Sequence, residues 1–233
     1  MDSGEIENRV RAVRERVGAV ARRARRPADA IRLVLASKTQ PAAAVRAAYA
    51  AGARDFGENY VQEALAKQNE LSDLNDIRWH LIGHLQSNKA RVAAAAFDLI
   101  HSVDSIRLGN ALSRCQPRVS APGARVAVLV EVNLGGEVSK TGIAPEETEP
   151  LIVALANKVD IRGLMAIPPP GPEPEHSRSY FVRLRDLRDR LAAATGLALS
   201  ELSMGMTDDF EVAIEEGATI VRVGRAVFGE RPR

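Results

Sequence analysis

The chain is poor in cysteine and lysine and has no long apolar run. Each of these shortages excludes certain classes of protein. Its one cysteine, Cys115, excludes a disulfide within the chain and is typical of proteins in a reducing compartment. No apolar run approaches the roughly 18 residues of a membrane span. Residues 1–20 carry charges throughout, unlike a secretory signal. We therefore expect a cytoplasmic protein that has no membrane partner.

The charges of the chain are nearly balanced. It has 32 basic and 30 acidic residues, which give a formal net charge of +2 at pH 7. The densest basic run, residues 22–26, closes an N-terminal segment of helical period, and cations are favoured at the C-terminus of a helix. The helix explains this run, so we expect no nucleic-acid partner.

Among the basic residues lysine is rare, and one lysine has an informative place. The five lysines are Lys38, Lys67, Lys89, Lys140 and Lys158. Lys38 ends the apolar run 31–38, which is typical of a strand buried on both faces, so its amine would be partly desolvated. Desolvation lowers the pKa of a lysine and frees its lone pair for attack on a carbonyl. The alternative is a solvated lysine that only ends the strand.

Segments typical of helices and of strands alternate along the 233 residues. Residues 5–24 predict an amphipathic helix, with apolar side chains at Ile6, Val10, Val13, Val17 and Val20. The predicted strands are 31–38, 54–57, 78–83, 98–102, 125–133, 161–167, 199–204 and 219–223. Helical stretches between them include 60–71, 105–115, 145–157, 175–195 and 208–216. Because a doubly wound sheet of this length would have fewer strands, we predict one α/β domain over residues 1–233, a (β/α)₈ TIM barrel with an extra N-terminal helix.

Polar and glycine-rich residues follow many of the predicted strands. In a barrel, functional groups gather at the C-terminal ends of the strands, and phosphate is often bound after the seventh and eighth. The turn 203–207 contains hydroxyl groups, and in the turn 223–229 Gly224 lets backbone N–H groups approach an anion closely. Two such turns at this pair of strands favour a phosphate site over two ordinary turns.

Arg222 lies two residues before Gly224, so the two share one face of the last strand. If that face points inward, the guanidinium reaches the barrel mouth opposite Lys38 and needs a partner, because a buried charge must be paired. If it points outward, the strand is only half-buried. His80 and His84 have a metal-ligand spacing, but a strand followed by a turn need not place them on one face, so we expect no metal site.

A series of motifs, in order from about residue 6 to residue 230, resembles the pyridoxal phosphate homeostasis proteins. The motifs are Leu35–Thr39, Phe56–Tyr60, Trp79–Gln86, Ser139–Gly142, Arg162–Met165, Leu202–Met206 and Val221–Gly224. The resemblance implies the barrel of the alanine racemases standing alone. It also implies pyridoxal 5′-phosphate (PLP) as the cofactor, held as an internal aldimine on Lys38.

The resemblance further implies a set of cofactor-binding residues. The set comprises Lys38 through its amine, Asn59 and His84 near the ring, Arg222 at the pyridine nitrogen, and the Ser203 hydroxyl with the backbone N–H groups of Gly224 and Arg225 at the phosphate. Many members of the family have Thr or Ser where this chain has Arg225. A contact through the backbone survives that change.

Three functions agree with these residues, and we favour the first. It is a non-catalytic monomer that binds PLP and buffers it or delivers it to PLP-dependent apoenzymes. The second is a PLP-dependent amino-acid racemase or related enzyme, and the third is a Schiff-base aldolase without the cofactor. An arginine at the pyridine nitrogen leaves that nitrogen unprotonated, which makes the ring a poor electron sink. A racemase also needs a second base, and the tyrosines Tyr49, Tyr60 and Tyr180 lie in helical stretches.

Overall fold

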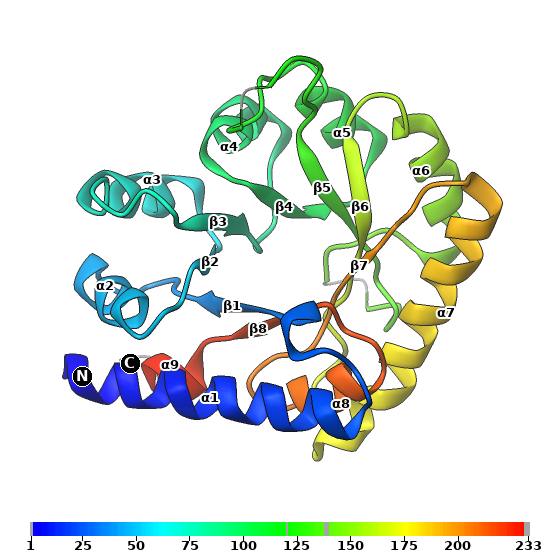
Figure 1. Cartoon of the computed structure of the whole chain (residues 1–233). Coiled ribbons are helices and arrows are strands. Elements are labelled where there is room, and N and C mark those ends of the chain that lie inside the picture. The colour runs from blue at the N-terminus through cyan, green and yellow to red at the C-terminus, as the bar shows by residue number, and fades with distance from the viewer. Residues whose placement is uncertain (1, 120, 138–139, 231–233) are drawn as a thin grey trace.

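The computed structural model describes residues 2–119, 121–137 and 140–230 of the chain. Parallel strands close into a barrel in which each strand pairs with the next and β8 returns to β1 (Figure 1). They are β1 (Arg32–Ala36), β2 (Asp55–Glu58), β3 (Arg78–Leu81), β4 (Leu99–Val103), β5 (Ala127–Glu131), β6 (Asp160–Met165), β7 (Glu201–Ser203) and β8 (Ile220–Val223). The predicted barrel of eight strands is confirmed. The assignment of residues 1–233 to one domain stays a prediction, and Ser139 of the family motifs lies outside the described residues.

Helices surround the barrel, and one of them precedes the first strand. They are α1 (Ser3–Arg23), α2 (Ala42–Ala50), α3 (Val61–Glu70), α4 (Ala90–Ala96), α5 (Ile106–Leu112), α6 (Thr148–Leu155), α7 (Arg178–Thr195), α8 (Phe210–Glu215) and α9 (Arg225–Phe228). Short 3₁₀ turns are η1 (Ala28–Ala30), η2 (Ser87–Lys89), η3 (Pro145–Glu147) and η4 (Pro174–Ser177). The N-terminal helix α1 lies along α2, α8 and α9 on the outside of the barrel (Figure 1), with its predicted apolar face buried.

Most strands are shorter than the sequence pattern predicts, whereas β2 and β4 have the predicted length and begin one residue later. The helices α2, α4 and α9 lie outside the helical stretches given by their ranges above. The run 31–38 forms a strand only over Arg32–Ala36, and Lys38 lies in the turn that follows. Alanine fills most of α2 and α4, so these helices show little contrast between apolar and polar faces. The helix α9 has four residues, which is too short for a periodic pattern.

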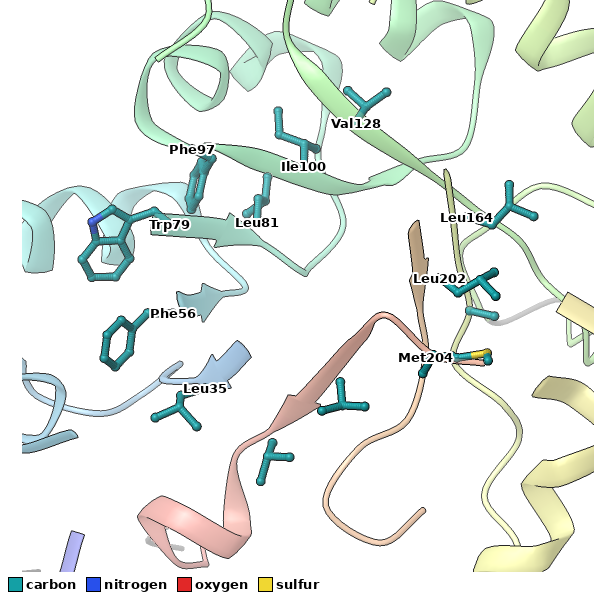
Figure 2. Close-up of a cluster of buried hydrophobic side chains, with 14 of the residues drawn as sticks. Leu35, Phe56, Trp79, Leu81, Phe97, Ile100, Val128, Leu164, Leu202 and Met204 are labelled. Atoms are coloured by element: carbon teal, nitrogen blue, oxygen red, sulfur yellow. The ribbon is translucent and has the colours of Figure 1, made fainter. Parts of the chain in front are cut away.

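Alternate residues of each strand face the helices and the barrel interior. The outward-facing side chains pack with the helices in one large apolar cluster, of which Figure 2 shows Leu35, Phe56, Trp79, Leu81, Ile100, Val128, Leu164 and Leu202 on the strands. A smaller cluster fills part of the interior, from Val34, Leu99, Ala127, Leu129, Met165 and Ile220. Other buried strand positions carry polar side chains, and these build the functional site.

Within the part of the chain that the structure describes, no helix combines the length and the apolar character needed to cross a membrane.

The outer core offers a direct test of the packing. Phe56 is completely buried on β2, and its ring centroid lies 6.0 Å from that of Trp79. We expect Phe56→Ala to lower the free energy of unfolding by about 3–5 kcal/mol, because it leaves a cavity between sheet and helices. Urea denaturation measures this change. The control Val153→Ala on α6, where the valine is 63% exposed, should change it by less than about 0.5 kcal/mol; equal losses would contradict the assigned packing.

Candidate functional site

A cavity of about 280 Å³ lies at the C-terminal ends of the strands. Its volume is at the small end of the roughly 300–1,000 Å³ of typical ligand pockets. The residues that line it are Ala36, Lys38, Thr39, Gln40, Asn59, Ile82, Ile167, Met206, Thr207, Asp208, Arg222, Gly224, Arg225, Phe228 and Gly229. Of the seven residues that the sequence assigns to cofactor binding, the structure therefore brings five together around this one cavity. Ser203 and His84 lie elsewhere.

Lys38 reaches the cavity because of where β1 ends. It lies two residues beyond Ala36, the last residue of the strand, and is half-buried in a turn. The turn is tied down on both sides: Ser37 donates its N–H to the carbonyl of Gly57 at 2.9 Å, and Gln40 donates to the carbonyl of Ser37 at 3.0 Å. Thr39 adopts φ of 64°, a left-handed conformation that reverses the chain after Lys38.

A buried cluster of charges beneath this turn was not identified from the sequence. The amine of Lys67 on α3 donates to Glu58 at 2.7 Å, to Glu63 at 2.8 Å and to the carbonyl of Ser37 at 2.6 Å. The hydroxyl of Ser37 also donates to Glu58 at 2.7 Å. Burial is the chief influence on Glu58 and raises the pKa of its carboxyl. The one signal in the sequence was the i, i+4 spacing of Glu63 and Lys67 on a helix.

Arg222 points into the barrel, which decides the alternative that the sequence left open. It shares the inner face of β8 with Ile220 and is buried. One terminal nitrogen, Nη1, donates to the hydroxyl oxygen of Ser203 at 2.5 Å, and Nη2 donates to the carbonyl of Ala166 at 3.0 Å. Burial lowers the pKa of Arg222 to about 10, so the guanidinium stays protonated at neutral pH.

The turn after β8 is shaped for an anion. A Cβ atom on Gly224 would lie 3.2 Å from the carbonyl oxygen of Ala36, so glycine lets the two chains approach closely there. Arg225 opens α9, and the first N–H groups of a helix have no acceptor within it. The Arg225 side chain forms ion pairs with Asp208 and, at 3.7 Å, with Glu230 at the surface. Its side chain is therefore engaged away from the backbone groups of the turn.

Ser203 and His84 do not line the cavity. Ser203 is completely buried at the end of β7, where its hydroxyl meets Arg222 and, at 2.9 Å, Nδ1 of His101. Thr207, four residues later in the loop that follows β7, lines the cavity. His84 lines a separate depression; its side chain is 47% exposed and Nδ1 lies 3.7 Å from a carboxylate oxygen of Asp104.

The buried histidines of the site are His80 and His101 instead. Both point into the barrel, and the sequence pattern indicates His80 only as a candidate metal ligand, which we did not expect it to be. Nε2 of His80 lies 3.0 Å from Asp55, so His80 and the exposed His84 do not share a site. The sequence does contain a signal for this pair. Both histidines lie inside strands whose side chains alternate between the inward and outward faces, and a histidine at an inward position of a barrel needs a polar partner.

Comparison with known proteins identifies the family. Residues 9–232 match the family described as alanine racemase, N-terminal domain. Proteins named pyridoxal phosphate homeostasis protein are 47% identical over 228 residues in Pseudomonas aeruginosa (97% of this chain, 96% of that protein) and 46% over 226 residues in Aquifex aeolicus (96% and 97%). The structure of PipY of Synechococcus elongatus PCC7942 with PLP bound is 42% identical, with a TM-score of 0.78, and the match covers 93% of this chain and all of that one. With such identity over nearly the whole length, the chain belongs to the pyridoxal phosphate homeostasis protein family.

Proposed function

We propose that this protein binds PLP in the cavity at the C-terminal ends of its strands and keeps the cofactor for buffering or delivery. The observation that carries the proposal is the convergence of an amine (Lys38), a guanidinium (Arg222) and an anion-ready turn (Gly224–Arg225) on one cavity. Their chemistry matches the aldehyde, the pyridine nitrogen and the phosphate of PLP. The relative with PLP bound, at 42% identity, supports the same ligand.

Each part of the cofactor has a group to meet it. The amine of Lys38 condenses with the aldehyde into a Schiff base and releases water. Arg222 faces the pyridine nitrogen, and Asn59 lies beside the ring. The apolar side chains of Ile82 and Ile167, which also line the cavity, cover the ring. The fit rests on donor types and on the close approach at Gly224.

For the contact with the phosphate we propose the hydroxyl of Thr207 in place of that of Ser203. Thr207 lines the cavity, whereas the hydroxyl of Ser203 is already engaged with Arg222 and His101. Thr207 therefore donates to the phosphate together with the N–H groups of Gly224 and Arg225. Ser203 contributes indirectly, by holding Arg222. His84, in its separate depression, has at most a role at the rim.

The charge of Arg222 favours holding the cofactor over chemistry on it. A protonated guanidinium beside the pyridine nitrogen disfavours a second positive charge there, so the ring withdraws electrons weakly. The hydroxyl of Tyr49 donates to Asp76 at 2.5 Å, and Tyr180 lies on α7 beside His176, so neither is presented to the cavity as a second base. The cytoplasmic location, the monomeric state and the transfer to apoenzymes remain part of this proposal.

We expect the full chain incubated with PLP to absorb near roughly 420 nm, because a Schiff base of PLP absorbs there. Borohydride should abolish the band, and Lys38→Ala should lack it. Lys158→Ala is the control, since Lys158 is exposed and its amine donates to Asn110 at 2.8 Å. A normal band in Lys38→Ala would overturn the assignment of the amine.

The PLP-bound protein also serves to distinguish a non-catalytic PLP-binding protein from a PLP-dependent enzyme. In deuterated water with L-alanine, we expect no α-proton exchange above that of Lys38→Ala. Exchange at enzymatic rates that depends on Lys38 would make the protein a racemase-like enzyme.

Arg222→Gln should weaken PLP retention by about tenfold, because it removes a charge-assisted contact to the ring and leaves Ser203 without its donor. Equilibrium dialysis of PLP and the position of the absorption band measure the effect. Arg162→Gln on β6, an exposed arginine paired with Asp160 at 2.8 Å, is the matched control. Unchanged affinity and spectrum in Arg222→Gln would show that the guanidinium does not meet the cofactor.

Thr207→Val keeps the shape of the side chain and removes its hydroxyl. We expect it to weaken PLP binding by roughly tenfold to a hundredfold, the worth of one hydrogen bond to a charged group, and to leave the binding of pyridoxal, which has no phosphate, unchanged. Competition assays with both compounds measure the difference. Equal losses for the two would place Thr207 away from the phosphate.

A further inference from the structure

A row of buried polar side chains crosses the barrel interior and ends at Arg222. It begins at Asp55, the first residue of β2, whose carboxylate oxygen lies 3.0 Å from Nε2 of His80. Nδ1 of His80 lies 3.0 Å from Nε2 of His101, and Nδ1 of His101 lies 2.9 Å from the hydroxyl of Ser203. Ser203 then accepts from Arg222 at 2.5 Å. The row joins strands β2, β3, β4, β7 and β8 by unbroken hydrogen bonds.

The Asp55 end of the row has a fixed role. Burial favours the neutral acid, but hydrogen bonds from His80 and Arg78 outweigh it and lower the pKa of Asp55 to about 2. Asp55 is therefore a carboxylate at neutral pH and can only accept hydrogen bonds. Arg78 donates to both of its oxygens, at 2.8 and 2.5 Å. The ring nitrogen of His80 that faces Asp55, Nε2, must then carry a proton.

The Arg222 end is fixed as well. A guanidinium has donors only, so Ser203 must accept from Arg222. His101 between the two ends is neutral at physiological pH, because its pKa is held well below the ordinary value, first by burial and then by the charge of the nearby Arg222. A neutral imidazole has one donor and one acceptor. Two arrangements of the row remain, and they differ in the direction of every bond between His80 and Ser203.

In one arrangement His80 is neutral: Ser203 donates to Nδ1 of His101, and Nε2 of His101 donates to Nδ1 of His80. In the other, His80 is an imidazolium, which donates to His101, and His101 donates to Ser203. The second adds a positive charge beside Asp55, whose charge Arg78 already neutralises in a bidentate pair. It also leaves the hydroxyl proton of Ser203 without an acceptor inside the row, which is costly for a buried donor. The first arrangement satisfies every member.

We propose that His101, held by His80 and Asp55, is a positioning residue for the cofactor site: its Nδ1 accepts a hydrogen bond from the hydroxyl of Ser203 and so turns the lone pairs of that hydroxyl toward Arg222. The donors run in one direction, from Arg222 through Ser203, His101 and His80 to Asp55. Ser203 then fixes one terminal nitrogen of the guanidinium, while the carbonyl of Ala166 fixes the other. This inference deepens the proposed function, since it rests on Arg222 meeting the ring of PLP.

The direction of the row is measurable without PLP. Long-range proton–nitrogen NMR correlations on the nitrogen-labelled full chain report which ring nitrogen of each histidine carries the proton. The chain has four histidines, and single His84→Gln and His176→Gln variants identify the two exposed ones. We expect both buried rings to be neutral and protonated at Nε2. A proton on Nδ1 of His101 at neutral pH would overturn the inference and leave the proposed function standing.

A double-mutant cycle tests whether His101 acts through Arg222. We expect His101→Phe, which keeps the ring shape, to weaken PLP binding by about tenfold and to shift the absorption band. His101→Asn, which offers an amide oxygen near the position of Nδ1, should restore most of the affinity. In an Arg222→Lys background, His101→Phe should change the affinity by less than about twofold. Equal losses in both backgrounds would show a general packing role and overturn the inference.

Ser203→Ala covers the case in which His101→Phe does not fold. It removes only the hydroxyl that links the two residues, so it should reproduce the affinity loss and the shifted band, and the loss should again vanish in Arg222→Lys. An unchanged affinity in Ser203→Ala would contradict the proposed path. If the loaded wild-type chain shows no Lys38-dependent band at all, the proposed function fails, whereas the NMR result still decides the direction of the row.

Discussion

The guanidinium of Arg222 is a charge inside a parallel barrel, and such a charge is stable only when its donors find acceptors. The acceptors come from the end of β7, through Ser203, and from the segment after β6, through the carbonyl of Ala166. A slip of β8 by one residue would turn Arg222 toward the helices and bring Val221 or Val223 inward. The register of the last three strands and the inward direction of the Arg222 side chain therefore depend on each other.

The opposite wall of the cavity depends on a second cluster of charges. The amine of Lys67 directs its three hydrogens at Glu58, Glu63 and the carbonyl of Ser37. Because Ser37 directly precedes Lys38, this cluster fixes the backbone from which the Lys38 amine projects. The two lysines thus differ in role. Lys67 forms an ion pair with the buried Glu58, and Lys38 lines the cavity. The cavity is held from β1 and α3 on one side and from β7 and β8 on the other.

The sequence predicts the barrel well because short apolar runs and helical periods are local properties. It also predicts that Lys38 and Gly224 meet, since strand ends in a barrel share one rim. The sequence does not show how deeply each polar side chain is buried in the barrel. Ser203 and Thr207 are two hydroxyl residues only four positions apart, and only the closed barrel shows that the first is buried against Arg222 while the second lines the cavity. The direction of Arg222 likewise depends on register, because a period of two gives shared faces but not which face is inside.

The burial of the histidines is likewise not evident from the sequence. Their positions also explain why part of the barrel interior is polar. The resemblance drew attention to His84, whose side chain is nearly half exposed, whereas His80 and His101 lie in the dense part of the barrel, next to apolar residues such as Leu99. Apolar side chains could fill those two positions and stabilise the barrel at least as well. A polar row is stable there only if every member is satisfied, which requires a single direction of donors from Arg222 to Asp55. Such a row provides what an apolar core does not, a fixed orientation for the guanidinium of Arg222, and the proposed contact with a cofactor depends on that orientation.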